Sequence, residues 1–420
     1  MDTGENYEVK DISLAEQGRK NIEWAEQHMK IMGTLKERFA KEKAFEGVRI
    51  GFALHVTKET AVLIRALRAG GAEVAIAGCN PLSTQDDVAA ALAEEGVAVF
   101  AYKGETKEDY YRYIEKVLSC KPNITIDDGG DLVTEVLTKK PELLPGIIGG
   151  CEETTTGIIR LRAMEKDGVL RYPMIAVNDN KTKHLLDNYY GTGQSTIDGI
   201  LRASNVLFAG KTVVVAGYGD CGKGVALRAK GLGSDVVITE IDAFRAMTAR
   251  LDGYRVMPMA EAAKIGDIFI TVTGDKNVVT VELMKSMKDG AMLANSGHFN
   301  NEVDVDGLNG AAESKEQLRP FLEKFIIGGK KLYLCAEGRL VNLSAAEGHP
   351  SEVMATSFAG QALACKYLLD NKGKLDNKVI TLPEEIDNEI AKLQLSAMGV
   401  KIDSLTAEQE KYLGSWEEGT

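Results

Sequence analysis

The stretch VVVAGYGDCGKG, residues 213–224, decides how the middle of the chain folds. An apolar run precedes a glycine turn, and the residues after the turn predict a helix. Gly217, Gly219 and Gly222 fit the pattern GxGxxG, in which the first glycine permits a tight turn, the second lets the backbone approach a pyrophosphate, and the third lets helix and strand pack closely. Because strand, turn and helix follow in order, the stretch predicts a dinucleotide-binding unit rather than a glycine turn without a cofactor.

Glu240 refines the choice of dinucleotide. It closes the next apolar run, about 20 residues beyond the glycine turn, where an acidic side chain binds ribose hydroxyls. A carboxylate at this place repels a 2′-phosphate, so the sequence favours NAD over NADP.

The composition sets the class of protein and of partner. A chain of 420 residues suits two domains, and 44% hydrophobic with 27% charged residues is typical of a folded protein. The net charge of -12 argues against broad binding to nucleic acid or anionic membranes, because both need clustered cations. We therefore expect a small-molecule substrate.

The ends and the cysteines indicate a cytoplasmic protein without a metal. The N-terminal residues lack a basic start followed by an apolar run, and no uncharged run approaches the ~20 residues that span a bilayer. The six cysteines are scattered, without a CxxC pair, which predicts neither a zinc site nor a disulfide framework.

The alternation of apolar runs and helical stretches predicts the fold class, which is α/β. From Val48 to about Asn180 the runs VRIGFAL, AEVAIAG, VAVFAY and NITID alternate with helices, and a second series follows from Gly210. We expect two doubly wound parallel-sheet domains with a small helical C-terminal tail. The predicted boundaries are 1–181 for a substrate-binding domain completed by 350–385, 190–345 for the inserted NAD-binding Rossmann domain, and 386–420 for a tail that contacts another subunit.

Polar side chains follow several of the predicted strands. His55, His298 and His349 lie where strands end in loops, the edge at which open α/β sheets bind ligands, whereas His28 and His184 are expected in solvent. Asp127 and Asp128 are expected on an exposed turn. Glu152 and Glu153 precede a threonine run that could cap a helix, and Lys183 and Asp187 are spaced as a surface ion pair. Together these groups could transfer protons around a hydroxyl-bearing substrate.

Longer matching segments connect the chain with a family. They are HVTKETAVL, GCNPLSTQDDVAAAL, KGET, DDGGD, EETTTG, VNDNKTK, DNYYGTGQSTIDGI, AGYGDCGKG, GHFNNEVD and AEGRLVNL, and they run in order between about Tyr7 and Tyr412. In this respect the chain resembles S-adenosylhomocysteine hydrolases. The resemblance implies a substrate domain with an inserted NAD domain, a homotetramer, and hydrolysis of a nucleoside thioether through transient oxidation of its 3′-hydroxyl.

The resemblance also implies roles for individual residues. Lys183 and Asp187 would handle the 3′-hydroxyl proton, provided that burial lowers the pKa of the lysine; Asp128 would take the 4′ proton, and His55 would act near the 5′ position. The implied catalytic set is His55, Asp128, Glu153, Lys183, Asp187 and His298, and the implied substrate contacts are Thr57, Glu59, Thr60, Asn188, His349 and Met354. The implied cofactor contacts are Thr154, Thr155, Thr156, Asn188, Gly217, Gly219, Asp220, Cys221, Gly222, Glu240, Thr273, Asn277, Asn295, Ser296, Gly297, Asn342 and His349.

Some positions depart from the family pattern and bear on the choice of substrate. Glu347 and Glu352 stand where relatives often have Met and Phe, Thr192 replaces a frequent cysteine, and the chain stops at SWEEGT, before the cofactor-reaching tail of many relatives. A carboxylate at Glu347 could accept the ring N–H of inosine, so S-inosylhomocysteine is a second possible substrate, although Thr57 and Glu59 favour adenine. A glycine turn that binds NAD would also suit a non-catalytic regulator or a plain dehydrogenase; the retained acid-base residues argue against the regulator.

Overall fold

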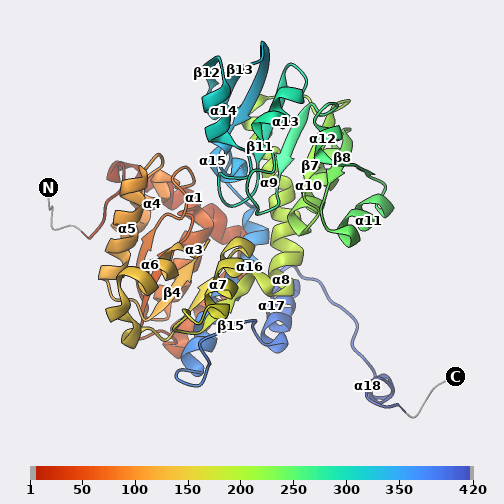
Figure 1. The fold of residues 1–420 in the computed structure, drawn as a ribbon. Coiled ribbons are helices and arrows are strands. Elements are labelled where there is room, and N and C mark those ends of the chain that lie inside the picture. Colours follow the sequence, from red (N-terminus) through yellow and green to blue (C-terminus); the bar gives the residue numbers. More distant parts are fainter. Residues whose placement is uncertain (1–5, 417–420) are drawn as a thin grey trace.

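The computed structural model describes residues 6–416. The chain forms two β-sheets with helices packed on them, and long helices connect the two units (Figure 1). The first sheet has the order β15-β6-β5-β4-β1-β2-β3, and all its strands are parallel. Its strands are β1 Arg49–Ala53, β2 Glu73–Ala77, β3 Ala98–Phe100, β4 Ile124–Asp127, β5 Gly149–Glu152, β6 Met174–Ala176 and β15 Val379–Ile380. Since β15 joins from the far end of the sequence, the chain leaves the first sheet and later returns to it.

Helices cover both faces of the first sheet. One core unites α3 Lys58–Ala69, α4 Asp86–Glu94 and α16 Ser351–Asp370 with one face, and α1 Ala15–His28 and α2 Lys30–Glu42 pack outside them. The other core contains α5 Lys107–Ser119, α6 Asp131–Lys139 and α7 Thr155–Lys166. Short 3-10 helices are η1 Ile12–Leu14, η2 Pro141–Gly146 and η3 Val177–Asp179.

The second sheet contains the glycine turn. Its order is β12-β13-β14-β11-β10-β7-β8-β9, in which β13 runs antiparallel to both of its neighbours, β12 and β14, and the other neighbouring strands are parallel. Its strands are β7 Thr212–Ala216, β8 Asp235–Thr239, β9 Arg255–Val256, β10 Ile268–Thr271, β11 Ala291–Asn295, β12 Ser314–Arg319, β13 Leu322–Ile327 and β14 Lys330–Cys335. The expected doubly wound sheet is therefore confirmed, with an antiparallel hairpin at one edge that the strand pattern did not predict.

The second sheet is also covered on both faces. Its helices are α9 Thr192–Ser204, α10 Asp220–Gly231, α11 Ala243–Leu251, α12 Met259–Ala262, α13 Val281–Ser286, α14 Val305–Ala311 and α15 Val341–Ser344, with a 3-10 turn η5 Ala336–Gly338. Helices α9 and α10 share one core, whereas α12, α13 and α14 share the other.

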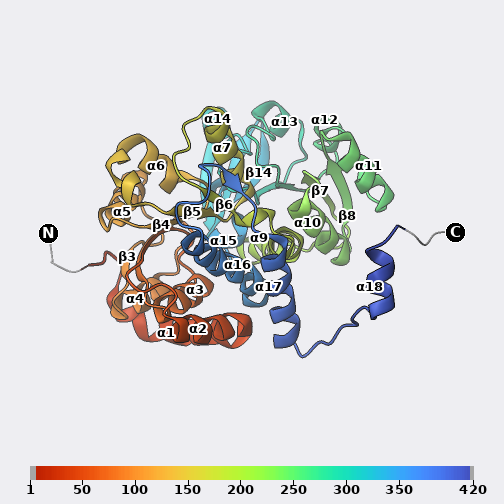
Figure 2. The ribbon, with the colours of Figure 1, turned by 90° about the horizontal axis from the view of Figure 1, so that it is seen from below.

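Two connections pass between the sheets, and α17 and α18 end the described chain (Figure 2). The first connection is α8 Lys181–Lys183, the π-helix η4 His184–Gly191 and α9; the second enters α16. Helix α17 Glu384–Ala397 packs on α16, and α18 Ala407–Leu413 lies away from the body. Within residues 6–416, no helix is long and apolar enough to cross a membrane.

Candidate active site

A large cleft lies where the two sheets face each other. It has a volume of about 1370 Å³ and is lined by residues following β1, β4 and β5 of the first sheet and β7, β8 and β11 of the second. Ligand pockets commonly measure ~300–1,000 Å³. The cleft is therefore large enough for a cofactor and a substrate side by side.

The glycine turn forms the cleft wall on the second sheet. Gly217 has a φ of 102°, and a Cβ on it would lie 2.8 Å from the carbonyl oxygen of Val272. A Cβ on Gly222 would lie 2.1 Å from the carbonyl oxygen of Gly217, so this glycine serves helix packing behind the cleft. A Cβ on Gly219 would meet only the Arg245 side chain, at an ordinary contact distance of 3.6 Å, and α10 begins directly after this glycine. This cradle at a helix N-terminus fits a pyrophosphate.

Glu240 lies beside this turn, after β8. Its Oε2 accepts a hydrogen bond from the Tyr218 backbone N–H at 2.7 Å, and its Oε1 accepts from Ile241 N at 2.7 Å and Asp242 N at 3.0 Å. The carboxylate lines the cleft and is held by backbone donors of both the turn and the strand end. Its place agrees with the predicted contact to a ribose.

Lys183 occupies the centre of the cleft and is buried. Its Nζ lies 2.8 Å from Asp187 Oδ2, 2.8 Å from Asn188 Oδ1 and 3.6 Å from Glu153 Oε1. Burial alone would lower the pKa of Lys183, but the carboxylates of Asp187 and Glu153 outweigh burial and raise it above its usual value. The predicted surface pair is thus wrong, and so is the expected lowering of the lysine pKa.

Asp187 is held from its other side by His349. His349 Nδ1 donates to Asp187 Oδ1, and Thr192 Oγ1 lies 3.2 Å from His349 Nε2. Burial would raise the pKa of Asp187, but His349 and Lys183 together hold it below its usual range. The carboxylate therefore stays ionised between two hydrogen-bond donors.

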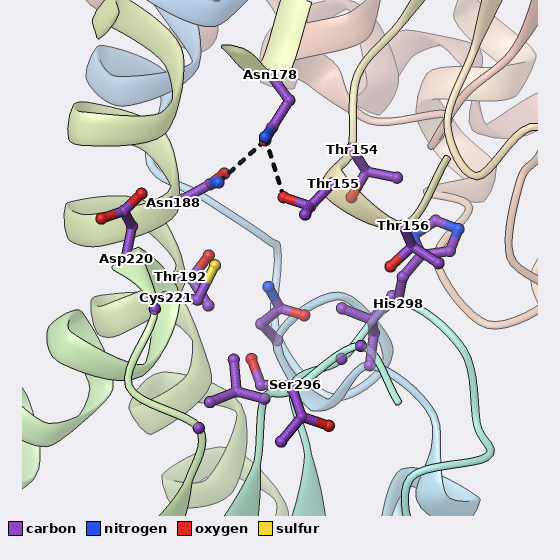
Figure 3. A pocket seen from close by; sticks show the side chains of 18 of the residues that line it. Thr154, Thr155, Thr156, Asn178, Asn188, Thr192, Asp220, Cys221, Ser296 and His298 are labelled. Carbon is purple, nitrogen blue, oxygen red and sulfur yellow. Dashed lines mark hydrogen bonds between the residues drawn. The ribbon is translucent and has the colours of Figure 1, made fainter. Parts of the chain in front are cut away.

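Asn178 connects this cluster with the threonine run. Its Oδ1 accepts from Asn188 Nδ2 at 3.0 Å, and its Nδ2 donates to Thr155 Oγ1 at 3.0 Å (Figure 3). The same Oδ1 also accepts from Lys183 Nζ at 3.3 Å. Sequence reasoning missed Asn178, although it stands in the matching segment VNDNKTK. The threonines themselves begin α7, and Thr154 makes no side-chain cap there.

Glu153 is the second carboxylate at Lys183. It accepts hydrogen bonds from Ser357 Oγ and Gln361 Nε2 of α16, two partners that the sequence did not single out. Burial raises the pKa of Glu153 to about 6, although Lys183 opposes the shift. Glu152, its neighbour, faces the other way and accepts from the backbone N–H groups of Gly129 and Thr154, so its role is structural.

A second titratable cluster lies at the end of β4. His55 Nε2 lies 3.3 Å from Asp128 Oδ2, and His298 Nδ1 lies 3.5 Å from Asp128 Oδ1. Asp127 and Asp128 are both buried, so the expected exposed turn is wrong. Burial lowers the pKa of His55 to about 4, despite the opposing effect of Asp128.

Gly129 brings the third member of this cluster close. Its φ is 110°, and a Cβ on it would lie 2.4 Å from His298 Nε2, so His298 from the second sheet packs directly on the backbone of the first. Ligand atoms of His55, Asp128 and His298 lie within 4.8 Å of one another, a spacing that a metal ion could also use.

The far end of the cleft is formed by α3, the loop before α16, and α16 itself. Thr57 caps α3 by accepting from Thr60 N at 3.4 Å, and Glu59 Oε1 accepts from Ser351 Oγ at 2.6 Å. Lys58 Nζ lies 3.3 Å from Glu59 Oε1 and 2.9 Å from Glu347 Oε2. Glu347 Oε1 in turn lies 3.0 Å from Arg202 of α9, so this carboxylate bridges two cations.

The cleft brings together nearly all the predicted site residues. Every one of them lines it except Gly222 and Asn295. Asn295 lies buried behind the wall, where its Nδ2 donates to the carbonyl oxygens of Gly297, Phe299 and Gly338 and shapes the loop that carries His298. Of the two histidines expected in solvent, His184 instead lines the cleft, and His28 is half-buried beside Trp24.

Comparisons with known proteins agree with this arrangement. A family model described as S-adenosyl-L-homocysteine hydrolase matches residues 6–144, and one described as S-adenosyl-L-homocysteine hydrolase, NAD binding domain, matches residues 188–348. The chain is 58% identical to an adenosylhomocysteinase of Sulfurisphaera tokodaii over 99% of this chain and all of that one. It is also 58% identical to an S-inosyl-L-homocysteine hydrolase of Methanocaldococcus jannaschii, over 99% of this chain and all of that one. An S-inosyl-L-homocysteine hydrolase of Methanococcus maripaludis is 54% identical, over 98% of this chain and 99% of that one.

Proposed function

The chain belongs to the S-adenosyl-L-homocysteine hydrolase family and carries its NAD-binding domain, and from this premise we propose how its own residues carry out the hydrolysis of S-adenosyl-L-homocysteine to adenosine and L-homocysteine. The observation that carries the proposal is the cleft in which Lys183, Asp187 and Glu153 lie between the glycine turn and the cluster of His55, Asp128 and His298. Groups for oxidation at one ribose carbon and elimination at the next are thus adjacent.

The chemistry explains why a hydrolase needs a redox cofactor. A thioether at the 5′ carbon is a poor target for water, whereas a ketone at the 3′ carbon makes the 4′ proton acidic and lets a 5′ thiolate leave. The glycine turn and the Glu240 carboxylate would hold NAD, which when bound would supply hydride acceptance from the 3′ carbon and hydride return. The cofactor is regenerated in each cycle, so it need not be exchanged.

Lys183 and its neighbours serve the 3′ position in this proposal. When the 3′ carbon loses a hydride, its hydroxyl must lose a proton, and Lys183 can accept that proton only in its neutral form, after giving up one of its own. Asp187, held by His349, is the ionised group that lies 2.8 Å from Lys183 Nζ and can balance its charge. Glu153 and Asn188 hold the ribose hydroxyls through their remaining acceptor and donor atoms.

Asp128 and the two histidines serve the 4′ and 5′ positions. Asp128 takes the 4′ proton, which lets the C5′–S bond break with its electron pair on sulfur. Burial lowers the pKa of His55 to about 4, so its ring is unprotonated at neutral pH. His55 can therefore accept a proton from the water that adds at C5′. His298, opposite Asp128, closes this part of the cleft against solvent.

In this proposal the nucleobase binds between α3 and the loop before α16. Glu59 Oε1 is occupied by Ser351 and Lys58, which leaves Oε2 to accept from the exocyclic amine of adenine. Glu347 already holds Lys58 and Arg202, and this engagement favours adenine over the inosine alternative that Glu347 raised. Because two relatives are named S-inosyl-L-homocysteine hydrolases, S-inosylhomocysteine is the substrate with which S-adenosylhomocysteine is compared in the test.

The proposal is tested by thiol release from purified protein carrying only its co-purified NAD. We expect many turnovers per bound NAD on S-adenosylhomocysteine, with a higher kcat/KM than on S-inosylhomocysteine. Faster turnover of the inosine compound would transfer the assignment to that substrate. The absence of thiol from either compound, with NAD bound, would leave a non-catalytic NAD-binding protein, and consumption of one added NAD per turnover would indicate a dehydrogenase.

We extend the proposal to a cytoplasmic homotetramer, as the family resemblance implies. Its support is the exposed apolar surface of the C-terminal segment, where Tyr412, Leu413 and Trp416 are 52%, 68% and 92% exposed. Sedimentation of the full chain, compared with a variant ending at Gly399, tests whether this segment joins subunits.

A further inference from the structure

Ser83 lies behind His55, on the loop between β2 and α4, and is only 2% exposed. It does not line the cleft. We propose that Ser83 is a positioning residue that fixes the proton of His55 on Nδ1 and so leaves Nε2 free to take protons in the cleft. This inference rests on the proposed function, because it assigns His55 to the 5′ chemistry.

The hydrogen bonds of Ser83 determine whether the serine or His55 is the donor in the bond between them. A serine hydroxyl has one hydrogen and can donate only once. Ser83 Oγ lies 3.0 Å from the backbone carbonyl oxygen of Asn80, which can only accept, and 2.7 Å from His55 Nδ1. Because the hydroxyl hydrogen is given to Asn80, the serine oxygen is left as an acceptor, and His55 Nδ1 must be the donor.

The same loop keeps Ser83 in place. Its backbone N–H donates to the same carbonyl of Asn80 at 3.2 Å, and Asn80 Oδ1 accepts from Leu82 N at 3.0 Å. The backbone of His55 is held as well, because its carbonyl oxygen accepts from Thr60 Oγ1 at 2.6 Å. Ser83 therefore cannot turn away from His55 without losing a buried hydrogen bond, which is costly.

The consequence falls on the other ring nitrogen. With Nδ1 protonated, neutral His55 carries a lone pair on Nε2, the atom 3.3 Å from Asp128 Oδ2. When water adds at C5′, its oxygen forms the C–O bond, one of its protons moves to Nε2, and the C4′–C5′ double-bond electrons shift toward the 3′ carbonyl. The imidazolium that forms still donates from Nδ1 to Ser83, so the acceptor stabilises both protonation states.

Removing the hydroxyl of Ser83 would allow His55 to adopt the other tautomer, with its proton on Nε2. In Ser83→Ala, Nδ1 has no acceptor, whereas an Nε2–H would donate to the Asp128 carboxylate, and the lone pair would face the protein instead of the cleft. A histidine base in the wrong tautomer loses most of its contribution, of the order of 10²–10⁴-fold. Oxidation at C3′ does not use His55 and should continue.

The experiment measures the two steps separately on the holoenzyme. The first is reduction of bound NAD after mixing with adenosine, followed at 340 nm; the second is steady-state thiol release from S-adenosylhomocysteine. For Ser83→Ala we expect the first rate within about twofold of wild type and the second reduced by about 10²-fold, with reduced cofactor accumulating during turnover. Ser83→Thr, which keeps the hydroxyl, should recover most of the thiol release.

Ser234→Ala is the matched control, since Ser234 is also buried and donates from Oγ to a carbonyl, that of Phe208, at 2.9 Å in the second sheet. It should leave both steps unchanged. Equal loss of both steps in Ser83→Ala, or loss of neither, would overturn the assignment. A wild-type protein that neither reduces its NAD nor releases thiol would instead contradict the proposed function itself.

Discussion

Single residues in the cleft owe their chemistry to neighbours that are remote in sequence. Lys183 and Asp187 have the spacing of an ordinary surface pair, yet both are buried and are held by Glu153 and His349. That these side chains belong to one site could be predicted from the sequence, and they do line one cleft. Their burial, and hence the direction in which the pKa of Lys183 moves, could not, because it depends on helix α16 packing on the first sheet.

The role of Lys183 can be tested by substitution. Lys183→Gln removes the only ammonium within reach of both Glu153 and Asp187 among residues 6–416, so reduction of bound NAD by adenosine should fall by about 10²–10⁴-fold. Lys181→Gln is the control, because Lys181 is exposed and pairs with Glu384 on the surface. Normal NAD reduction in the Lys183 variant would exclude the proposed proton transfer.

The pH dependence of the oxidation step should follow Glu153. Its pKa is raised to about 6, so the carboxylate is ionised above this pH and gains a proton as the pH falls through it. The neutral form loses its attraction for Lys183 and its second acceptor for ribose hydroxyls. We therefore expect the rate of NAD reduction to decline below about pH 6 in wild type, and the slower Glu153→Gln variant to lack this decline near pH 6. A wild-type rate that stays constant down to pH 5 would contradict this assignment.

At the scale of elements, the glycine turn and its helix were the most predictable part of the molecule. Gly217 and Gly222 do what the pattern predicts, because Gly217 has a positive φ and a Cβ on Gly222 would collide with the backbone of the turn. The approach of Gly219 to a pyrophosphate stays a prediction. The π-helix His184–Gly191 was not predictable, since its wider turn arises where the connection between the sheets packs on α10 and α16. The antiparallel hairpin of β12 and β13 was also missed, because β12 is exposed along its whole length and lacks an apolar alternation.

Gly222 gives a test at this scale. In Gly222→Ala the new Cβ would lie 2.1 Å from the Gly217 carbonyl oxygen, so the turn must shift. We expect a loss of stability of about 1–3 kcal/mol and weaker NAD retention. Gly231→Ala, at the end of the same helix with no atom within 4 Å of its Cβ, should be neutral or stabilising. Thermal unfolding and NAD content measure both; equal effects of the two variants would mean that the close approach does not matter.

At the scale of the whole molecule, the site exists only because the chain leaves the first sheet and returns to it. Strand β15 and helix α16 follow the second unit in sequence and complete the first, and α16 supplies Ser357 and Gln361 to Glu153. The two-sheet architecture followed from the alternation of strands and helices. The family resemblance, rather than periodicity, indicated which side chains of the two sheets would meet in one cleft.

Glu347 tests how the two units cooperate. It joins Lys58 of α3 to Arg202 of α9 but is 56% exposed, and exposed ion pairs contribute only ~0–1 kcal/mol. Glu347→Gln should therefore raise KM a few-fold at most, and equally for the adenosine and inosine substrates. Glu384→Gln is the control, because Glu384 is also exposed and pairs with a cation, Lys181, outside the cleft. A tenfold change in the ratio of kcat/KM between the two substrates would contradict this prediction and show that Glu347 discriminates between adenine and hypoxanthine.

The central claim is that hydrolysis proceeds through oxidation and elimination within one cleft. The most direct measurement is turnover of S-adenosylhomocysteine in D₂O, followed by proton NMR of the adenosine formed. We predict that the 4′ hydrogen is replaced by deuterium, because Asp128 exchanges its proton with solvent, while the 3′ hydrogen is retained, because the hydride returns to its own carbon. Adenosine that keeps both hydrogens would mean direct displacement at the 5′ carbon and would contradict the account.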